Sequence, residues 1–447
     1  MNQVEESSMK RTDPTDRISE LPDTVLSHIL SSIPTKSVVR TSILAKRWRY
    51  IWKSVPVMDF DENLFPRQTG NAEHENTSFV GFVDRVMESH DDTDIRKLRL
   101  AFFDADIARV NKWIQIAIDR NVRELLIETP KNYVEFTESL FSCDSLVYLK
   151  FDRSYANLKL PESFCFSSLR TLCLSAVYFP ENALLVQLLS GCPVLQDLDM
   201  NGCRWSMLER EVEISSPTVT TLSLDGSCPV VRSNGDCKMK DRTIKICIPN
   251  VKSFKYIDHI AKDYNMESHL SLVNAFIDVR IGEPYWSEAY ENCGYSVVNL
   301  LKGLSNARYL SLSDSTLELL CDASDLEEVL PKFPNLEKLV IISGRHELHF
   351  IAIAFLLQSS PVLKTLEIQI ESSPKYKHIY DQEEGYGLAE GEGFENLYLH
   401  CLKEVKICGF GDSENELNFV KLLLRVANKT KINIIKDRGD IEINVCT

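Results

Sequence analysis

Few side chains in this sequence stand at spacings that support chemistry. The HELH segment at 346–349 separates its histidines by three positions, whereas the zinc-binding pattern H-E-x-x-H separates them by four, one helical turn. The HDDTD segment at 90–94 has oxygen donors for a cation, but a solvated turn is the simpler interpretation. The Gly-x-Gly pairs at 385–387 and 391–393 lack the strand-turn-helix context of a phosphate-binding loop. We therefore expect no catalytic residue, no cofactor and no metal site, and an interaction protein rather than an enzyme.

The composition limits the class of partner. The 447 residues carry a net charge of −15, so a nucleic acid, which favours a basic surface, is a poor match. Thirteen cysteines are scattered without a CxxC pair, which indicates small buried thiols in a reducing compartment, the cytoplasm and/or the nucleus. No apolar run approaches the roughly 18 residues of a membrane span, and residues 1–15 lack the apolar core of a signal peptide. We expect a protein partner, no nucleic acid and no membrane.

The elements that would position a binding surface begin at Leu21. A first helix is expected after Leu21-Pro22-Asp23, because proline is favoured at helix starts and aspartate suits the first turn. Its apolar residues recur at i, i+3, i+4 and i+7 on one face: Leu26, Ile29, Leu30 and Ile33. Pro34 ends this helix, and Thr35 is the expected N-cap of a second. A third helix is expected to carry an apolar face with the same spacing, made by Trp48, Ile51, Trp52 and Val55.

A helical unit of this size needs support from outside its own core. About 40 residues bury too little surface to be stable without disulfides, a metal or a partner. No cysteine lies between residues 1 and 131, so no thiol can staple the unit. Apolar residues on more than one helical face therefore predict that one face packs internally and another binds a second protein. The alternative is a small bundle whose tryptophans are only core residues.

This segment resembles an F-box. The resemblance rests on Leu21-Pro22-Asp23, on Ile29-Leu30, and on the ending SILAKRWRYIW at 42–52, which is similar to the form common in plant F-box/leucine-rich-repeat proteins. It implies a three-helix domain at 16–56 that docks onto a Skp-type adaptor, which bridges to a cullin ubiquitin ligase. The positions that match the motif imply an adaptor interface near Leu21, Pro22, Ile29, Leu30, Leu44 and Trp48.

A phrase of the form apolar-x-x-Leu-x-apolar recurs between 95 and 370. Clear copies are spaced by about 23 to 29 residues, the range of leucine-rich repeats. Their last two apolar residues are Leu98/Leu100, Leu125/Ile127, Leu149/Phe151, Leu172/Leu174, Leu198/Met200, Leu222/Leu224, Leu310/Leu312, Leu339/Ile341 and Leu366/Ile368. Weaker copies stand at Phe254/Tyr256 and in AFIDVRI at 275–281, and a further copy, Val405/Ile407, follows the array.

Each copy predicts a short strand whose two apolar residues point to one face, and stacked copies predict a parallel sheet over a continuous core. Helices are expected between strands, for example at 108–120, 181–191 and 347–360. The region resembles the degenerate leucine-rich repeats of plant F-box proteins, so we predict an α/β solenoid. The alternative is a mixed α/β domain of independent βα units. The residues expected to line the concave face are Cys173, Asp199, Ser223, Ser311, Val340 and Glu367.

The remaining segments complete the expected domain order. Residues 1–15 are expected to be a disordered tail, 57–94 a variable linker with a strand at 57–62 and a helix at 79–89, and 371–393 an acidic Gly-rich loop. Residues 394–447 contain CLKEVKICGFGDSENELNFVKLLLRVAN, which is similar to the FBD domain found at the end of many plant F-box/repeat proteins. We expect this segment to cap the last repeat.

These patterns predict the substrate-recognition subunit of a Skp-cullin-F-box (SCF) ubiquitin ligase. The F-box would dock the adaptor and, through it, the cullin, while the repeat surface would bind an unidentified target protein. One alternative is a scaffold or sequestering module that binds the adaptor without promoting ubiquitination. Another is a receptor that holds a small ligand in the repeat concavity, although the neutral or acidic concave positions suit an anion such as an inositol phosphate poorly.

Overall fold

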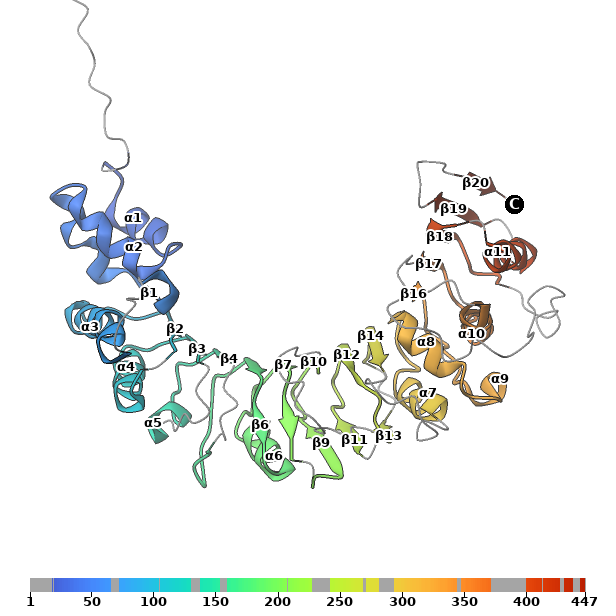
Figure 1. The fold of residues 1–447 in the computed structure, drawn as a ribbon, viewed down its shortest axis with the longest axis horizontal. Coiled ribbons are helices and arrows are strands. Elements are labelled where there is room, and N and C mark those ends of the chain that lie inside the picture. Colours follow the sequence, from blue (N-terminus) through green and yellow to red (C-terminus); the bar gives the residue numbers. More distant parts are fainter. Residues whose placement is uncertain are drawn as a thin grey trace, which may run out of the picture.

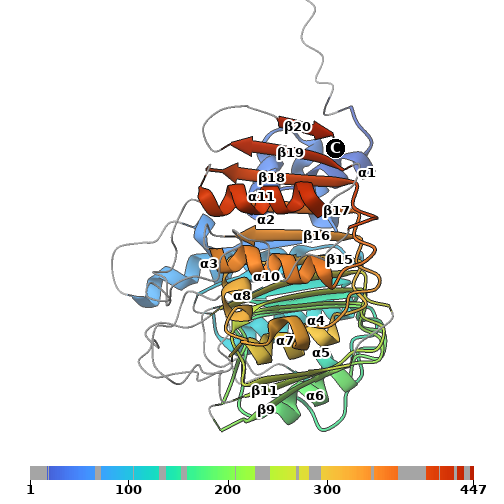
Figure 2. The ribbon, with the colours of Figure 1, turned by 90° about the vertical axis from the view of Figure 1, so that its right-hand side faces the viewer.

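The structure is a computed structural model that describes residues 18, 20–65, 72–103, 105–129, 137–152, 159–206, 208–226, 242–267, 271–280, 293–343, 347–370, 399–411, 413–426, 430–436 and 443–446. The chain forms an arc, with helices of the N-terminal segment at one end and the C-terminal strands at the other (Figure 1). One long sheet lines the concave side, and helices and short strands cover the outer side (Figures 1 and 2). The predicted tail at 1–15 and the predicted loop at 371–393 lie outside the described residues.

The long sheet contains fifteen strands arranged in chain order. The strands of the outer layer, β6, β8, β9, β11 and β13, are not part of it. All neighbouring pairs are parallel except the last, in which β19 and β20 are antiparallel. The strands are β1 (Val57–Asp61), β2 (Lys97–Ala101), β3 (Glu124–Glu128), β4 (Tyr148–Asp152), β5 (Thr171–Ser175), β7 (Asp197–Asn201), β10 (Thr221–Asp225), β12 (Ser253–His259), β14 (Asn274–Arg280), β15 (Tyr309–Leu312), β16 (Lys338–Ser343), β17 (Thr365–Ile370), β18 (Glu404–Phe410), β19 (Lys431–Lys436) and β20 (Ile443–Cys446). This order confirms the predicted solenoid of stacked parallel strands.

The repeated phrase sets the register of the sheet. Its leucine positions lie side by side in one buried column, in which Leu98 pairs with Leu125, Leu125 with Leu149, and so on along the arc. The weak copies join the same column, because Phe254 pairs with Ala275 and Ala275 with Leu310. Side chains alternate between the two faces of a strand, so one leucine in register fixes which face of its strand enters the core.

Helices cover the outer side of both ends of the arc. The N-terminal half has α3 (Ala72–Ser89), α4 (Ile107–Asp119), α5 (Glu138–Phe141) and α6 (Asn182–Ser190). The C-terminal half has α7 (Cys293–Gly303), α8 (Asp314–Leu320), α9 (Leu326–Val329), α10 (Glu347–Gln358) and α11 (Glu414–Val426). The helices predicted at 108–120, 181–191 and 347–360 correspond to α4, α6 and α10.

The middle of the outer layer differs from the expectation of helices between strands. Here β9 (Glu211–Ser215), β11 (Thr243–Cys247) and β13 (Asp263–Met266) form a second, three-stranded parallel sheet. These segments have apolar residues at every second position, such as Val212 and Ile214 in β9, and this period of two suits a half-buried strand rather than a helix. A smaller parallel pair, β6 (Tyr178–Phe179) and β8 (Arg204–Trp205), comes before these strands in the chain.

The sheet begins before residue 95. Strand β1 pairs with β2 along its full length, and α3 adds Phe79 and Val83 to the same core that contains Phe60 of β1. Residues 57–94, expected to be a linker, are therefore the first unit of the array. The strand at 57–62 itself was predicted correctly, but its place in the sheet was not, because VMDFD lacks the leucine of the repeated phrase.

The C-terminal segment continues the same sheet rather than forming a separate body. Val405 of β18 lies in the leucine column between Leu366 and Ile432. A bulge interrupts the pairing of β18 with β19 between Cys408 and Phe410, and Gly409 adopts a φ of +78° there. Beyond β19, the antiparallel β20 ends the sheet.

Candidate functional site

The N-terminal unit, residues 20–56, folds around a small core of its own. Its two α-helices, α1 (Asp23–Leu30) and α2 (Thr35–Arg40), each follow a proline with extended backbone, Pro22 and Pro34. The expectation that Thr35 is the N-cap of the second helix is corrected, because Pro34 is the N-cap and Thr35 is the first residue of α2. A 3₁₀ turn at Thr41–Ile43 follows α2, and two further 3₁₀ turns, Arg47–Arg49 and Ile51–Ser54, replace the expected third helix. Trp48 and Ile51 belong to two separate turns, yet both side chains are buried in the core of the unit. The core consists of Leu26, Leu30, Val38, Trp48, Ile51 and Val55.

The structure separates the six predicted adaptor-contact residues into two groups. Ile29 and Leu44 are exposed, at 46% and 69%, and Pro22 is also exposed. Leu30 and Trp48 are only 2% and 7% exposed, and Leu21 packs against the same core. Leu30 and Trp48 thus stabilise the unit from inside in this structure, and the placement of the six residues near an adaptor interface stays a prediction.

Several exposed apolar residues of the unit were not among the predicted contact residues. Ile43 is 85% exposed and Tyr50 is 60% exposed. Among the described residues, seven of the fourteen exposed large hydrophobic side chains lie between residues 18 and 50: Ile18, Val25, Ile29, Ile33, Ile43, Leu44 and Tyr50. Such a concentration of exposed apolar residues on a small unit is typical of a protein-interaction surface. In the sequence, these residues appear only as a second apolar face of the helices, and the spacing does not indicate which face is exposed.

Charged side chains surround this exposed face. The Arg47 guanidinium contacts the Asp23 carboxylate at 2.6 Å and donates to the carbonyl oxygen of Leu21 at 2.5 Å, which ties the 3₁₀ turns to the start of α1. Arg49 and Lys53 each lie 5.7 Å from the centre of the Tyr50 ring, within the range of a cation–π contact. Basic side chains therefore lie next to Tyr50 and to the start of α1 in this unit.

Three contacts fix the N-terminal unit to its neighbours, one to strand β1 and two to the segment that follows α3. The Thr35 hydroxyl accepts a hydrogen bond from the Asp59 N–H at 2.7 Å, and the Asp91 N–H donates to the Lys53 carbonyl at 2.9 Å. His90 Nε2 lies 3.1 Å from the Val55 carbonyl oxygen. His90 was expected in a solvated turn, but it is 5% exposed. Its burial, together with the nearby Arg120 guanidinium, lowers the pKa of His90 below its usual value.

The concave face of the sheet is the second candidate surface. The predicted lining residues Cys173, Asp199 and Ser223 lie side by side in register, as do Ser311, Val340 and Glu367. All six are exposed or half-buried, in contrast to the leucine column on the other face of the same strands. The alternation of apolar and intervening residues in the repeated phrase therefore identified the concave positions correctly.

Most carboxylates on the concave face have a basic partner. Arg99 alone contacts Asp59 at 2.8 Å, Asp61 at 3.6 Å and Glu128 at 2.7 Å. Lys150 lies 3.1 Å from Asp152. The basic side chains of the concave face are thus largely occupied by carboxylates of the same or neighbouring strands.

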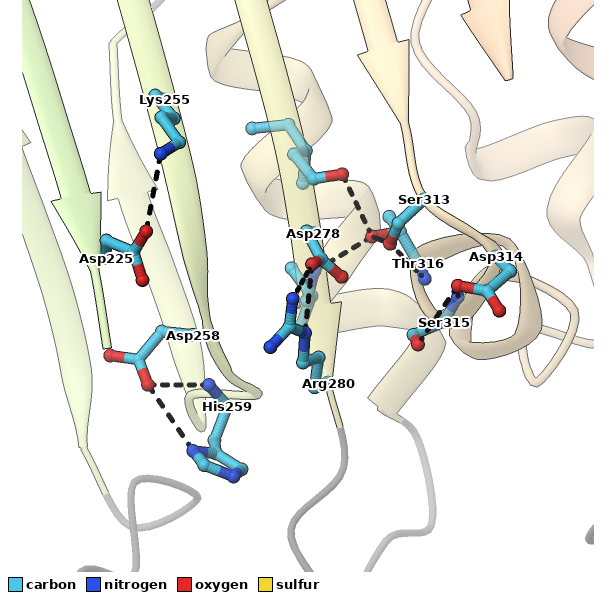
Figure 3. Close-up of polar contacts among 12 residues, drawn as sticks. Asp225, Lys255, Asp258, His259, Asp278, Arg280, Ser313, Asp314, Ser315 and Thr316 are labelled. Carbon is cyan, nitrogen blue, oxygen red and sulfur yellow. Dashed lines mark hydrogen bonds and ion pairs between the residues drawn. The ribbon is translucent and has the colours of Figure 1, made fainter. Parts of the chain in front are cut away.

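The same pairing continues at the carboxyl ends of β10, β12 and β14 (Figure 3). Lys255 lies 3.3 Å from Asp225, and Arg280 binds Asp278 through its guanidinium. Beside them, the Thr316 hydroxyl accepts a hydrogen bond from the Val279 N–H at 2.9 Å and lies 3.0 Å from the Ser313 hydroxyl. These contacts provide hydrogen-bond partners for backbone groups next to the start of α8. They do not form an arrangement typical of a catalytic site.

The described residues offer little catalytic chemistry. Among them, no group of three or more histidine, cysteine, aspartate or glutamate side chains is arranged to hold a metal ion. Burial raises the pKa of the Cys192 and Cys321 thiols to about 12, so both are poor nucleophiles. Of the HELH histidines, His349 is buried in α10, while His346 lies outside the described residues. No helix in the described part of the chain is both long and apolar enough to cross a membrane.

Comparison with known proteins agrees with this geometry. A model of the F-box domain matches residues 18–60, which include the N-terminal unit, and a model described as the At1g61320/AtMIF1 leucine-rich-repeat domain matches residues 86–432. The chain belongs to the F-box/leucine-rich-repeat family. Proteins of this family in plants are in general non-catalytic substrate receptors, and their F-box generally binds a Skp-type adaptor. We use the names F-box unit for residues 20–56 and repeat array for the strands and outer layer from β1 onward.

Relatives from Arabidopsis thaliana resemble the chain over most of its length. The F-box/LRR-repeat protein At4g14103 is 30% identical over 365 residues, which cover 79% of this chain and 91% of the relative. The FBD-associated F-box protein At1g66310 is 31% identical over 373 residues, covering 81% and 79%. The putative F-box/FBD/LRR-repeat protein At3g59240 is 30% identical over 427 residues, covering 92% and 81%.

Proposed function

We propose that this protein is the substrate-recognition subunit of an SCF-type ubiquitin ligase. The exposed apolar face of the F-box unit binds a Skp-type adaptor, which connects the protein to a cullin. The repeat array binds a target protein and holds it near the ubiquitin-transferring subunits. In this role the protein contributes a high effective concentration of target, and other subunits supply the chemistry.

The observation that carries the proposal is the exposed apolar face of the F-box unit. Ile43 and Leu44 project from a turn at 85% and 69% exposure, while the core of the same unit is complete without them. Burial of apolar area is the main favourable term in protein association, so residues of this kind are expected at the centre of an interface. The basic side chains of Arg49 and Lys53, next to the exposed Tyr50, suit a partner with acidic residues beside its own apolar surface.

The C-terminal segment is proposed to be an FBD-type cap. A sheet of stacked repeats needs a last unit that covers its core, and α11 with β18 and β19 stands at that position. The start of α11 is fixed by a reciprocal capping contact, in which Glu416 Oε2 accepts from the Ser413 N–H at 2.8 Å and the Ser413 hydroxyl accepts from the Glu416 N–H at 3.3 Å. The FBD names carried by two of the relatives support this assignment.

The location of the protein is proposed to be the cytoplasm and/or the nucleus. Ten of the cysteines in the described part of the chain are free thiols. Such a population of unpaired thiols is typical of a reducing compartment.

Neither alternative has comparable support. A small anionic ligand would need unoccupied basic side chains in the concavity, but Arg99, Lys150 and Lys255 each contact carboxylates. A scaffold without ubiquitination shares the adaptor contact, so it must be tested by its consequence. We expect that replacing Ile43 and Leu44 with glutamate in the full chain, expressed in plant cells, raises the abundance of proteins that co-purify with the repeat array about twofold or more, because they escape degradation. Unchanged abundance, with adaptor binding lost, would favour the scaffold.

A further inference from the structure

The residues that immediately precede the long-sheet strands from β2 to β18 form a continuous backbone ladder. The N–H of each residue donates to the carbonyl oxygen of the equivalent residue on the preceding strand at 2.8–3.1 Å. The first of these bonds joins Arg123 to Arg96, and the last joins Lys403 to Lys364. Because the strands run parallel, the whole ladder lies at one edge of the arc, where the strands begin (Figure 2).

Basic side chains are concentrated in this ladder. Seven of its twelve residues are lysine or arginine and one, Glu337, is acidic, although the chain as a whole carries a net charge of −15. All seven basic residues are exposed. We call them the basic rim: Arg96, Arg123, Arg170, Lys252, Arg308, Lys364 and Lys403.

The basic rim differs from the basic side chains of the concave face in its ion pairs. On the concave face Arg99, Lys150 and Lys255 each contact a carboxylate. Within the described part of the chain, Lys364 is the one rim residue that does so, at 3.0 Å from Glu337. The other six charged groups of the rim are therefore available to an anionic partner.

Two further carboxylates precede the ladder by two or three residues. Asp94 accepts a hydrogen bond from the Asn121 side-chain amide at 2.9 Å, and Asp144 accepts one from the Ser167 hydroxyl at 2.7 Å. Both donors are neutral, and among the described residues neither carboxylate lies within 4.0 Å of a rim nitrogen. These groups reduce the positive charge of the edge without pairing with any rim side chain.

The length of the basic rim suits an extended segment of a partner. Neighbouring strands in a sheet are about 4.8 Å apart, so the ladder from Arg96 to Lys403 spans about 50 Å. An extended polypeptide rises about 3.3 Å per residue, so about 16 residues cover this distance. The rim is one side chain wide, which fits a single extended strand rather than a nucleic-acid duplex.

The surroundings of the rim favour a protein segment over a single-stranded nucleic acid. The adjacent concave face carries Asp197 and the exposed Asp199, which oppose a dense row of phosphates. Single-stranded nucleic acids also stack their bases on aromatic side chains. In the described part of the chain, Tyr309 is the one exposed aromatic residue that adjoins the ladder.

From these observations we propose that the basic rim is a docking surface for an acidic segment of the target protein, rich in aspartate and glutamate and about 16 residues long. Each exposed guanidinium can contact a carboxylate through two N–H groups, and the row of positive charge also accelerates encounter with an acidic partner. This inference rests on the proposed function, since it concerns the target of the same repeat array.

The test uses the full chain and a fluorescent 16-residue peptide that repeats the sequence Asp-Gly-Glu-Ser. Binding is measured by fluorescence anisotropy at about 0.1 M salt, where exposed charges act over about 10 Å. A second peptide, with asparagine and glutamine in place of aspartate and glutamate, probes the role of charge. A 16-nucleotide oligouridylate probes the alternative of a nucleic-acid site.

Two triple variants with the same change in net charge separate the rim from the rest of the surface. The rim variant combines Arg123→Gln, Arg170→Gln and Arg308→Gln. The control variant changes three exposed basic residues on the outer helices α3, α4 and α11, and combines Arg85→Gln, Lys112→Gln and Lys421→Gln.

We expect the acidic peptide to bind the wild type, and the amide peptide to bind about tenfold or more weakly. The rim variant weakens binding of the acidic peptide about tenfold or more, because it loses three charge-assisted contacts. The control variant changes binding less than about twofold, because its lost charges lie away from the rim and are screened. The oligouridylate binds more weakly than the acidic peptide.

Three results with the peptides would overturn the inference: no binding of the acidic peptide, equal binding of the acidic and amide peptides, or equal weakening by the two variants. An oligouridylate that binds as tightly as the acidic peptide, or more tightly, would also overturn it and indicate a nucleic-acid site. The adaptor takes no part in this assay. Failure of peptide binding in a protein that still binds its adaptor therefore contradicts this inference alone and leaves the proposed function in place.

Discussion

The side-chain oxygen of Thr35 accepts a hydrogen bond from the backbone N–H of Asp59 at 2.7 Å, and this contact joins the F-box unit to the first strand of the repeat array. Thr35 begins α2 and is 5% exposed, while Asp59 lies in the middle of β1. An edge strand needs partners for its outward N–H groups, and α2 supplies one. The F-box unit therefore doubles as the N-terminal cap of the sheet, which fixes its position relative to the concave face.

The first prediction concerns this contact. Thr35→Val keeps the shape of the side chain but removes the acceptor, so the buried Asp59 N–H loses its partner. We expect the free energy of unfolding of the N-terminal region to fall by about 1–3 kcal/mol. Urea denaturation and hydrogen exchange at the Asp59 amide measure the effect. Thr35→Ser, which keeps the acceptor, should retain most of the protection; equal loss in both variants would show that packing, not the hydrogen bond, matters.

The second prediction concerns the pH dependence of the junction. Burial lowers the pKa of His90 in the folded protein, whereas in the unfolded chain it titrates near its ordinary value of about 6.5. Below about pH 6.5 the unfolded chain therefore takes up a proton that the folded protein does not. The contribution of His90 to the free energy of unfolding is therefore complete above about pH 6.5. It is lost as the pH falls toward the folded-state pKa, and the free energy of unfolding then changes by up to about 1.4 kcal/mol per pH unit.

Denaturation midpoints of the wild type and His90→Asn, measured from pH 7.5 to 5, test this expectation. The variant should be less stable at neutral pH, because it loses the contact to the Val55 carbonyl, but its stability should fall less steeply below about pH 6.5. Parallel curves for the two proteins would mean that His90 does not determine the acid sensitivity of the junction.

The third prediction compares the two faces of one strand. Leu172 is fully buried in the leucine column, and Cys173, its neighbour in β5, is half-buried on the concave face. Leu172→Ala should lower the free energy of unfolding by about 2–5 kcal/mol through lost apolar contacts and a residual cavity. Cys173→Ala should change it by less than about 1 kcal/mol. Chemical denaturation of both variants checks the difference, and similar losses would contradict the assigned faces.

The fourth prediction concerns the bulge at the C-terminal end of the sheet. A Cβ atom on residue 409 would lie 2.1 Å from the Ile370 carbonyl oxygen, and the φ of +78° is unfavourable for residues other than glycine. Gly409→Ala should destabilise β18 and β19 by about 2 kcal/mol or more. Gly81→Ala in α3, where the nearest atom is 3.6 Å away, should be neutral or stabilising. Hydrogen exchange in β19 distinguishes the variants, and full protection in Gly409→Ala would show that the bulge can relax.

The sequence predicted the sheet well because its signal is local. The pair Leu310/Leu312 identifies a strand, its buried face and its place in the column without reference to any other part of the chain. Even Ala275, in a weak copy, falls in the column because alternation alone sets the face. The outer strand β9 was not predicted from the sequence. It has only five residues with two apolar positions, it lacks the repeated leucine pattern, and it is too short for alternation alone to identify a strand.

The F-box surface was harder to predict, for a physical reason. Spacing at i, i+3 and i+4 identifies apolar faces of a helix, but it does not say which face packs inside. Trp48 and Leu44 both belong to the recognised motif, yet Trp48 is buried and Leu44 is exposed. The role of His90 depends on Val55 and Arg120, whose positions become visible only in three dimensions.

Adaptor binding by the exposed apolar face tests the central claim most directly. We would measure the affinity of the full chain for a plant Skp-type adaptor by titration calorimetry, using Ile43→Glu with Leu44→Glu and, as a matched control, Leu208→Glu with Leu417→Glu, two exposed apolar residues elsewhere. If the face is the adaptor interface, the first variant loses about 2–4 kcal/mol or more of binding free energy, and the control binds like the wild type. A wild-type protein that does not bind, or a first variant that folds and binds as tightly as the wild type, would contradict the assignment of this face as the adaptor interface.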